Sequence, residues 1–248
     1  MGLPELPTPF EAQGDHIAID LPGARALFTT RRGGHSTGPF ESLNLGILTE
    51  DDPAAVAANR ERLGDDHGVE FAWGLQVHAA RVQRRDRPND GADPVEADGQ
   101  ATTTPGVAPM VLGADCLTVA IAGGGAVAVV HAGWKGLAAG VVAEGVTAIR
   151  ELGANGAIEA AIGPAAGPCC YEVGEELHER FAPYGPGVRR GRNLDLKAIA
   201  TRQLRDAGVQ SVHDVGLCTI CAGEDLFFSH RRDRGVTGRQ AAIAWLTA

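Results

Sequence analysis

This sequence of 248 residues lacks long apolar runs, a broad distribution of positive charge and the pattern of an N-terminal signal peptide. Its longest apolar run, Val119 to Val130, contains three consecutive glycines and is too short to cross a bilayer. The first residues are rich in proline and acids, whereas a signal peptide begins with basic residues and continues with an apolar core. We therefore expect a cytoplasmic protein that does not span a membrane.

Positive charge is also in short supply. The sequence has 22 Lys and Arg residues against 31 Asp and Glu residues, which gives a net charge of -9. Because the basic residues are scattered among acids, they form no broad cationic face for a phosphate backbone. We expect no nucleic-acid partner.

Cysteine is scarce, and the five present are an odd number that fits a reducing compartment better than a framework of disulfides. Cys218 and Cys221 form a C-x-x-C pair, which is typical of half a zinc site or of a redox pair, but no second C-x-x-C is present. We expect these two to be ordinary buried thiols. Cys169 and Cys170 are adjacent in a Gly- and Pro-rich turn, an awkward arrangement for two ligands of one metal.

Helical and strand patterns alternate along the chain, without a repeat or a low-complexity linker, and indicate one domain of mixed α and β architecture. The stretch 84–106, dense in Pro, Gly, Asp and Thr, is predicted to be a long surface loop. Caps and periodicity predict three helices, the first from Asp51 or Asp52 to Gly64, the second from 137 to Gly153, and the third from Asn193 or Asp195 to Gly208. Strands are predicted at 24–30, 116–122, 126–132, 157–163 and 226–230.

The most apolar segment of the chain nevertheless holds an acid, a thiol and an imidazole: Asp115, Cys116 and His131. Two predicted strands flank the three consecutive glycines, and this pattern indicates a hairpin. A two-residue loop at Gly123 and Gly124 places Cys116 directly opposite His131. Opposed residues share a face with Cβ atoms about 5 Å apart, within reach of one metal ion. The register thus predicts that these two side chains face each other.

His78, in the segment LQVHAARV, is the candidate for a third metal ligand. A single Cys or His in an apolar strand is most often a core residue, so the prediction depends on the combination of His78, Cys116 and His131. Neutral imidazole and thiolate are ligands suited to zinc, or to copper in a suitable geometry. Three protein ligands leave one position open, which is the arrangement of a catalytic site.

Basic residues beside glycines are a second signal. Arg31, Arg32 and His35 surround a Gly-Gly turn whose backbone amides can hold an anion. Arg231, Arg232 and Arg239 repeat the pattern near the C-terminus. Composition alone favours solvated turns. Two such clusters in an acidic protein nevertheless point to a phosphate or carboxylate ligand.

Taken together, the motifs resemble those of the YfiH-like family, also called the polyphenol oxidase or laccase domain family. The resemblance covers Ala24 to Leu246, and it departs from the family pattern at Ala79, Gly113 and His230, none of which is a candidate ligand. The motifs occur in the family's order: TTRRGGHSTGPFESLNLG, NRERL, LQVHAARV, ADG, ADCLTVAI, HAGWKGL, AIGPAAGPCCYEV, CT and FFSHRRDRGVTGR.

The resemblance implies an α+β fold, a single domain with mixed sheets flanked by helices, distantly similar to the catalytic domain of cytotoxic necrotizing toxins. We accordingly expect a catalytic domain at 24–248, preceded by an extension and first strand at 1–23. The resemblance also implies that His78, Cys116 and His131 are catalytic and bind zinc, with copper as the alternative metal. The residues expected to bind substrate are Arg32, Asn44, Asp115 and Arg231, of which Arg32 and Arg231 are the expected phosphate contacts.

The activities that the resemblance implies are phosphorolysis of purine nucleosides (adenosine, inosine, guanosine and methylthioadenosine), adenosine deamination, copper-dependent phenol oxidation and hydrolytic editing of peptidoglycan precursors. True multicopper oxidation is disfavoured, because it needs many histidines, commonly paired as H-x-H, and this chain has eight histidines and no such pair. We predict a zinc-dependent purine nucleoside phosphorylase with adenosine deaminase activity, whose partners are a nucleoside and phosphate.

Two further interpretations stay open. In an amidase acting on peptidoglycan precursors, Cys116 is the nucleophile, His131 is the base and Asp115 lies beside them. A metal-binding or partner-regulating module without catalysis is the non-enzymatic alternative.

Overall fold

The computed structural model describes residues 2–89 and 94–247, and these form an α+β arrangement with two six-stranded mixed sheets. The first sheet has the order β1 (Glu11–Gln13), β2 (His16–Leu21), β3 (Ala24–Phe28), β14 (Gln240–Leu246), β7 (Val107–Gly113) and β4 (Glu70–Ala72). The second has the order β13 (Ser211–Asp214), β10 (Glu159–Ile162), β8 (Leu117–Gly123), β9 (Ala126–Ala132), β6 (Gly99–Thr102) and β5 (Val82–Arg84). A small ribbon pairs β11 (Arg189–Arg190) with β12 (Asn193–Leu194). The α-helices are α1 (Pro53–His67), α2 (Trp134–Ala139), α3 (Val141–Glu151), α4 (Glu175–Phe181) and α5 (Leu196–Asp206).

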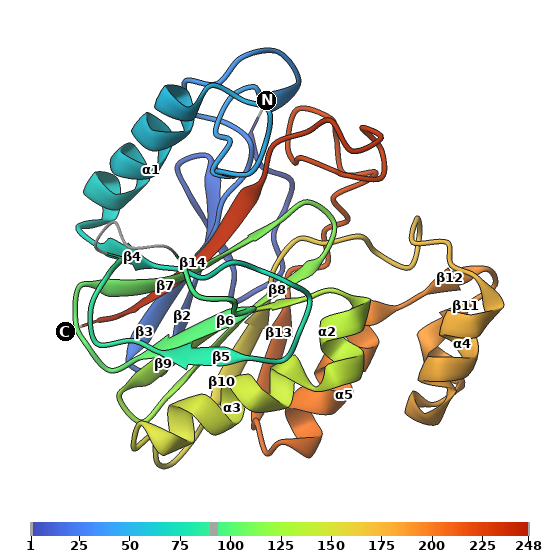
Figure 1. Ribbon diagram of the computed structural model, residues 1–248. Coiled ribbons are helices and arrows are strands. Elements are labelled where there is room, and N and C mark those ends of the chain that lie inside the picture. The colour runs from blue at the N-terminus through green and yellow to red at the C-terminus, as the bar shows by residue number, and fades with distance from the viewer. Residues whose placement is uncertain (1, 90–93, 248) are drawn as a thin grey trace.

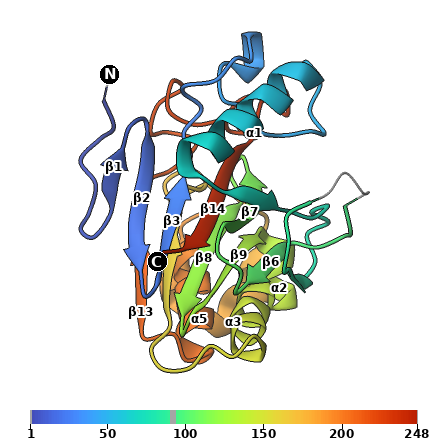
Figure 2. The same cartoon turned by 90° about the vertical axis from the view of Figure 1, so that its left-hand side faces the viewer.

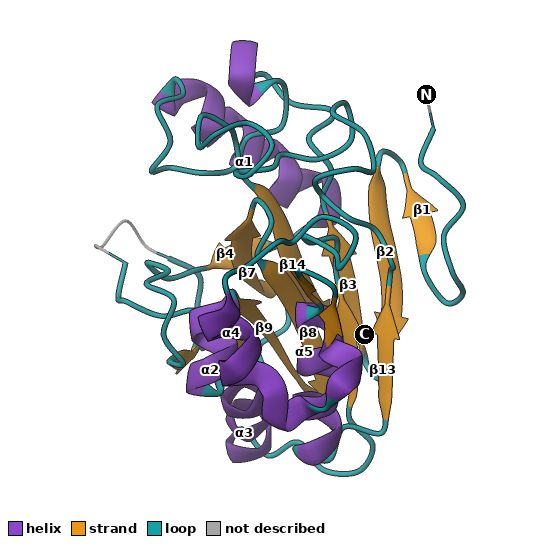
Figure 3. Cartoon of the chain, turned by 90° about the vertical axis from the view of Figure 1, so that its right-hand side faces the viewer, coloured by secondary structure: helices purple, strands orange, loops and turns teal. Residues whose placement is uncertain are grey.

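The two sheets pack against each other, and helices cover their outer faces, so the predicted class is confirmed. Helix α1 lies at one end of the molecule, on the outer face of the first sheet (Figures 1 and 2). Helices α2, α3 and α5 gather on the outer face of the second sheet, at the opposite end (Figure 3). Helix α4 and the β11–β12 ribbon lie to one side of these layers (Figure 1). None of the described helices is long and apolar enough to cross a membrane.

Strands β8 and β9 are buried along their whole length, which explains why the predicted hairpin is the most apolar part of the chain. Alternate residues such as Val127 and Val129 pack against the first sheet. Their neighbours Ala128 and Val130 face the helical layer, where α3 lies against β9. A strand covered on both faces has no polar side, so it reads as a continuous apolar run.

The predicted helices exist, but two of them have different limits. Asp52 caps α1, since its Oδ1 accepts a hydrogen bond from Ala54 N at 2.9 Å, and the helix continues past Gly64 to His67. The second predicted helix is divided into α2 and α3. Gly140, with φ +87°, ends the first and precedes the second, because this left-handed conformation stops an α-helix. Asp195 caps α5, as one of the two predicted caps.

Two strand and loop predictions are wrong. Residues 226–230 lie in turns and irregular backbone instead of a strand. The stretch 84–106 contains the buried strand β6 instead of a continuous surface loop. Strand β6 pairs with β9, and its burial exceeds what its polar composition suggests. Part of the predicted loop, residues 90–93, lies outside the described residues. The N-terminal residues of the chain add β1 and β2 to the edge of the first sheet.

The glycine turn lies one residue later than the sequence predicted. Gly123 pairs with Ala126, and the loop consists of Gly124 and Gly125, whose φ angles are +57° and +80°. Two successive left-handed residues form the turn that suits a tight hairpin. The turn is held in place by close packing, because a Cβ at Gly124 would lie 2.2 Å from Asn155 N.

This shift changes the partner of His131 but not the face on which it lies. Thr118, and not Cys116, pairs with His131 across β8 and β9. Moving the turn by one residue moves each pairing by two, so Cys116 keeps the side of the hairpin that the predicted register gave it. The expectation that the two side chains converge therefore survives a wrong register.

Replacing Gly125 distinguishes the two registers. We expect Gly125→Val to lower the free energy of unfolding by about 1–2 kcal/mol, because valine is strained at a positive φ. Gly125→Asn should cost less, since asparagine tolerates this conformation. Urea unfolding of both variants measures the difference. A valine variant as stable as the asparagine variant would place Gly125 in a strand and contradict the observed turn.

Candidate metal centre

His78, Cys116 and His131 come together in the folded chain, as the sequence predicted. One ligand atom from each lies within 4.8 Å of the other two. Cys116 Sγ is 4.0 Å from His78 Nε2, and the two imidazole rings meet edge to face with centroids 4.9 Å apart. Two imidazole nitrogens and one thiolate are a donor set that suits zinc and also accepts copper. The residues present therefore fit a metal ion with three protein ligands, and we call this group the candidate centre.

His131 occupies its position because β9 holds it between the sheets. Its side chain is buried, and its Nδ1 is 2.9 Å from Oδ1 of the fully buried Asp98. Asp98 stands directly before β6, the neighbouring strand, and its backbone oxygen accepts a hydrogen bond from His131 N at 2.7 Å. A carboxylate that accepts from Nδ1 leaves Nε2 as the nitrogen for a metal.

His78 lies in a loop that the same carboxylate holds. The backbone N–H groups of Val77, His78 and Ala79 all donate to Asp98, at 3.1, 2.9 and 2.8 Å. His78 has a φ of +60°, a conformation that a non-glycine residue adopts only when its surroundings enforce it. Asp98 thus orients both histidines, one through its ring and one through its backbone.

Asp98 is the functional residue that the sequence interpretation missed. Its motif, ADG, contributed to the family resemblance, but nothing assigned it a role beside the metal ligands. One signal could have found it: Asp98 is an acid directly before β6, and β6 pairs with β9, the strand that carries His131. Burial raises the pKa of Asp98, but the hydrogen bonds from His131 and from backbone N–H groups outweigh burial and lower it.

The charged forms of Cys116 and His131 stabilise each other. Burial raises the pKa of the Cys116 thiol, but the charge of His131 and hydrogen bonds from both histidines lower it to about 6. Burial lowers the pKa of His131, but the Cys116 thiolate and Asp98 raise it to about 9. The cysteine is therefore a thiolate at neutral pH, the form that binds a metal or acts as a nucleophile.

Gly133 makes room for the candidate centre. A Cβ at this position would lie 3.0 Å from Cys116 Sγ and 3.1 Å from the His78 ring. A side chain at this position would press on two candidate ligands, so the glycine of the HAGW motif favours the close approach of the backbone to them.

The candidate centre opens into a cavity of about 550 Å³, within the size range of small-molecule sites. Three aromatic side chains and four basic ones share its lining with the candidate ligands. The aromatic residues are Trp73, Trp134 and Tyr171, and the basic residues are Arg60, Lys135, Arg231 and Arg239. We call this space the main cavity.

Asp115 lies in the main cavity but uses its carboxylate to join two other loops. Its Oδ1 accepts from Thr219 Oγ1 at 2.6 Å, and its Oδ2 accepts from Arg231 N at 2.7 Å. Its backbone oxygen accepts from Ala166 N at 2.8 Å. The expected role of Asp115 in substrate binding stays a prediction, and its observed contacts are those of a residue that positions the cavity wall.

Two arginines from the C-terminal cluster reach the main cavity. The Arg231 guanidinium lies 4.7 Å above the Tyr171 ring and donates to Glu172 O. Arg239 donates to the backbone oxygens of Thr237 and Gly238 at 2.8 and 2.9 Å. Burial lowers the pKa of Arg239, and the charges of Cys116 and Asp115 oppose this shift, which places its guanidinium within electrostatic reach of the candidate centre.

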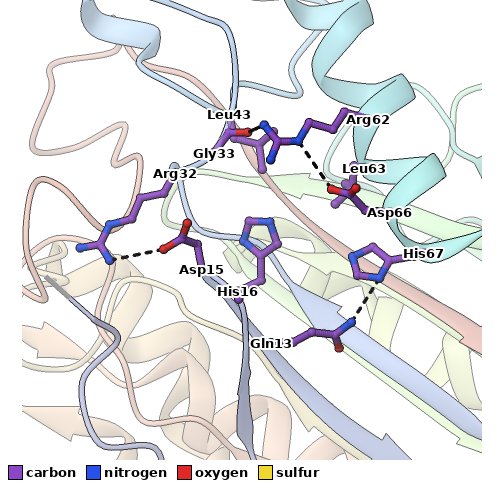
Figure 4. Close-up of a pocket in the computed structure, with 11 residues that line it drawn as sticks. Gln13, Asp15, His16, Arg32, Gly33, Leu43, Arg62, Leu63, Asp66 and His67 are labelled. Carbon is purple, nitrogen blue, oxygen red and sulfur yellow. Dashed lines mark hydrogen bonds and ion pairs between the residues drawn. The ribbon is translucent and has the colours of Figure 1, made fainter.

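Arg32 and Asn44 do not line the main cavity. Arg32 lines a second cavity of about 290 Å³, where it pairs with Asp15 at 4.0 Å (Figure 4). It also pairs with Asp225. Asn44 is fully buried. Its Nδ2 donates to Thr49 and Asp51, and its Oδ1 accepts from backbone N–H groups, including that of Arg239 at 2.8 Å. Asn44 therefore shapes the loop beside the main cavity, and both substrate assignments stay predictions.

Residues 25–247 match a family of proteins described as multi-copper polyphenol oxidoreductase laccase. Relatives named purine nucleoside phosphorylase include one from Corynebacterium glutamicum, 40% identical over 234 residues, which cover 90% of this chain and 94% of the relative. Another, from Streptomyces coelicolor, is 42% identical over 236 residues, which cover 90% and 96% of the two chains.

Solved structures share the same fold over nearly the whole chain. YlmD from Geobacillus stearothermophilus superimposes with a TM-score of 0.87 at 36% identity, covering 98% of this chain and all (100%) of that one. YfiH from Bacillus licheniformis superimposes with a TM-score of 0.84 at 32% identity, covering 97% and 100%.

Replacing Asp98 tests whether it supports metal binding. We expect Asp98→Asn to weaken zinc binding about 10–100-fold, because the amide supplies only one acceptor oxygen for His131 and the backbone of the His78 loop. Competition with a coloured chelator measures the affinity, and circular dichroism checks the fold. Asp20→Asn, at an exposed carboxylate paired with Arg25, is the matched control. Equal zinc affinity in both variants would contradict the role assigned to Asp98.

Proposed function

This chain belongs to the multi-copper polyphenol oxidoreductase laccase family, and within that family we propose that it is a metal-dependent purine nucleoside phosphorylase. The observation that carries the proposal is the convergence of His78, Cys116 and His131 in a cavity that also offers aromatic rings and arginines. The names of its relatives support the same reaction.

The main cavity suits the purine of a nucleoside and the phosphate that reacts with it. A purine is flat and aromatic, and it stacks favourably on rings such as those of Trp73, Trp134 and Tyr171. Phosphate is bound most strongly by guanidinium groups, which Arg231 and Arg239 supply. We propose these two as the phosphate contacts nearest to the candidate centre.

In phosphorolysis a phosphate oxygen forms a bond to C1′ of the ribose while the bond from C1′ to the purine nitrogen breaks. The electron pair of the broken bond leaves with the purine nitrogen, which takes up the proton that the phosphate releases. Positive charge develops on the ribose in the transition state. The arginines hold the phosphate close to C1′, and its negative charge stabilises this developing positive charge. The products are a free purine and ribose 1-phosphate.

The chain's own groups prepare the candidate centre for a metal. Asp98 keeps a proton on His131 Nδ1, so Nε2 faces the thiolate of Cys116. A zinc ion bound at His78, Cys116 and His131 would act as a Lewis acid and polarise a phosphate, ribose or water oxygen. Adenosine deamination, which replaces the amino group at purine C6 with a water oxygen, is the second activity that we propose for this site.

A cysteine-dependent amidase is the alternative that a specific observation favours. Cys116, His131 and Asp98 form a chain of nucleophile, base and orienting carboxylate, with the thiol pKa lowered to about 6. The orienting acid is Asp98, whereas the sequence pointed to Asp115. In this alternative the thiolate attacks an amide carbonyl and needs no metal.

Multicopper oxidation receives less support from the described residues. The described residues contain two groups of three or more potential metal ligands. One is the candidate centre, and the other is a cluster of cysteines without histidine. Copper at the candidate centre itself remains the alternative to zinc. Metal analysis of the purified protein, followed by reloading with each metal, identifies which ion supports activity.

Incubation of zinc-loaded protein with adenosine, with and without phosphate, tests the proposed reaction. We expect adenine and ribose 1-phosphate only when phosphate is present, and inosine as the product of deamination, both separated by chromatography. Chelation should abolish both activities and zinc should restore them. Amide hydrolysis that survives chelation and is lost in Cys116→Ala, in a protein inactive on nucleosides, would replace the phosphorylase with the amidase.

Substitution of Arg239 tests the phosphate contact. We expect Arg239→Gln to raise the KM for phosphate about 10-fold or more, with a smaller change in the KM for the nucleoside, because a charged hydrogen bond to phosphate is lost. Steady-state kinetics measure both constants. Arg202→Gln, at an exposed arginine of α5 paired with Asp206, is the matched control.

Arg32→Gln belongs in the same series, since the sequence assigned Arg32 to phosphate and the structure places it in the second cavity. A rise in phosphate KM in this variant, with none in Arg239→Gln, would move the phosphate site to Arg32 and contradict our assignment.

A further inference from the structure

The four cysteines outside the candidate centre gather in a second group. Their sulfur atoms all lie within 4.8 Å of one another, and the Sγ atoms of Cys169 and Cys221 are 3.5 Å apart. Cys218 is buried, as the sequence predicted, whereas Cys221 is exposed, contrary to that prediction. We call this group the cysteine cluster, and its members are Cys169, Cys170, Cys218 and Cys221.

The spacing of these sulfur atoms fits a metal ion better than a disulfide. Four thiolates at about 2.3 Å from a tetrahedral zinc lie about 3.8 Å from each other. The 3.5 Å between the sulfur atoms of Cys169 and Cys221 and the 4.8 Å limit for all four are compatible with this arrangement. A disulfide needs about 2.05 Å between two sulfur atoms and leaves the other two cysteines without a role.

Adjacency of Cys169 and Cys170 does not keep their sulfur atoms apart. Cys170 N donates to Gly167 O at 3.0 Å, and this tight turn presents both cysteines to the C-x-x-C loop. Two adjacent residues cannot bind the same metal ion when their side chains point in different directions. Here each sulfur lies within 4.8 Å of the other three, so the expected obstacle to shared ligation is absent from this turn.

The backbone around Cys218 is prepared for a negatively charged sulfur. Gly167 N donates to Cys218 Sγ at 3.3 Å, and the backbone N–H groups of Ile220 and Cys221 also act on this sulfur. Hydrogen bonds from N–H groups to an ionised acceptor are stronger than those between neutral groups. The segment before Cys169 and the C-x-x-C loop are also joined by a parallel bridge between Ala165 and Cys218.

We propose that the cysteine cluster binds a structural zinc ion through its four thiolates. All four ligand positions are then filled by protein, which is the mark of a structural and not a catalytic zinc site. The exposed side chains of Cys169 and Cys221 leave a path by which the ion enters. This proposal does not depend on the reaction proposed for the main cavity.

A metal in the cysteine cluster ties together two loops that build the wall of the main cavity. Thr219, inside the C-x-x-C segment, donates to Asp115 at 2.6 Å. Tyr171, next to Cys170, stacks on the Arg231 guanidinium. The cluster therefore connects the support of Asp115 to the aromatic and basic lining of the cavity.

Metal content in a chain that lacks the candidate centre tests the proposal. The background variant His78→Ala/Cys116→Ser removes two candidate ligands and leaves the cysteine cluster intact. After purification under reducing conditions and loading with zinc, we expect this background to retain about one zinc ion per chain, and Cys221→Ser in the same background to lose it. Replacement by Co²⁺ should give intense visible and sulfur-to-cobalt charge-transfer absorption in the background variant.

Two results would overturn the structural zinc site. One is a background variant without bound metal, or with metal that is unaffected by both Cys221→Ser and Cys169→Ser. The other is a disulfide between Cys169 and Cys221 that persists after purification under reducing conditions and prevents zinc from binding. Circular dichroism checks that each variant folds, and Cys169→Ser replaces Cys221→Ser if the latter does not. Loss of nucleoside activity in the background variant bears only on the candidate centre.

Discussion

The buried carboxylate of Asp98 is the contact on which the candidate centre depends. It accepts from the ring of His131 and from three backbone N–H groups of the His78 loop, so one side chain fixes two candidate ligands. A buried carboxylate is costly unless its oxygens are satisfied, and here its partners are the groups that the site must hold in place. The loop that carries His78 therefore has little freedom to move away from the hairpin without leaving this charge unpaired.

The sheets supply the rigidity that this arrangement needs. Strands β8 and β9 are covered by the first sheet on one face and by helices on the other, so the hairpin cannot shift without opening the core. The candidate ligands lie where Cys116 leads into β8 and where His131 ends β9, next to a cavity formed by loops. A rigid pair of strands thus holds the side chains of Cys116 and His131 at the main cavity, and the loops that form this cavity determine which ligand it binds.

Apolar periodicity and caps act locally, so the sequence predicted helices at α1, α2 with α3, and α5, and four of its five predicted strands are present. The three candidate ligands came from their combination in one sequence and from the family resemblance. It missed the position of the glycine turn, which depends on packing between Gly124 and Asn155, far apart in the sequence. Strand β6 was missed because its short, partly polar sequence shows no strand pattern. It is a strand because it pairs with β5 and β9 and is buried between them. The role of Asp98 and the gathering of four cysteines depend on contacts between distant segments, which one sequence does not reveal.

The central claim is that His78, Cys116 and His131 together bind the metal on which activity depends. X-ray absorption at the zinc edge, measured on Cys221→Ser protein with one zinc per chain, tests it most directly, because this variant leaves the candidate centre intact. We predict one sulfur at about 2.3 Å and two imidazole nitrogens at about 2.0–2.1 Å from the zinc. A first shell without sulfur would show that Cys116 is not a ligand and would contradict the claim.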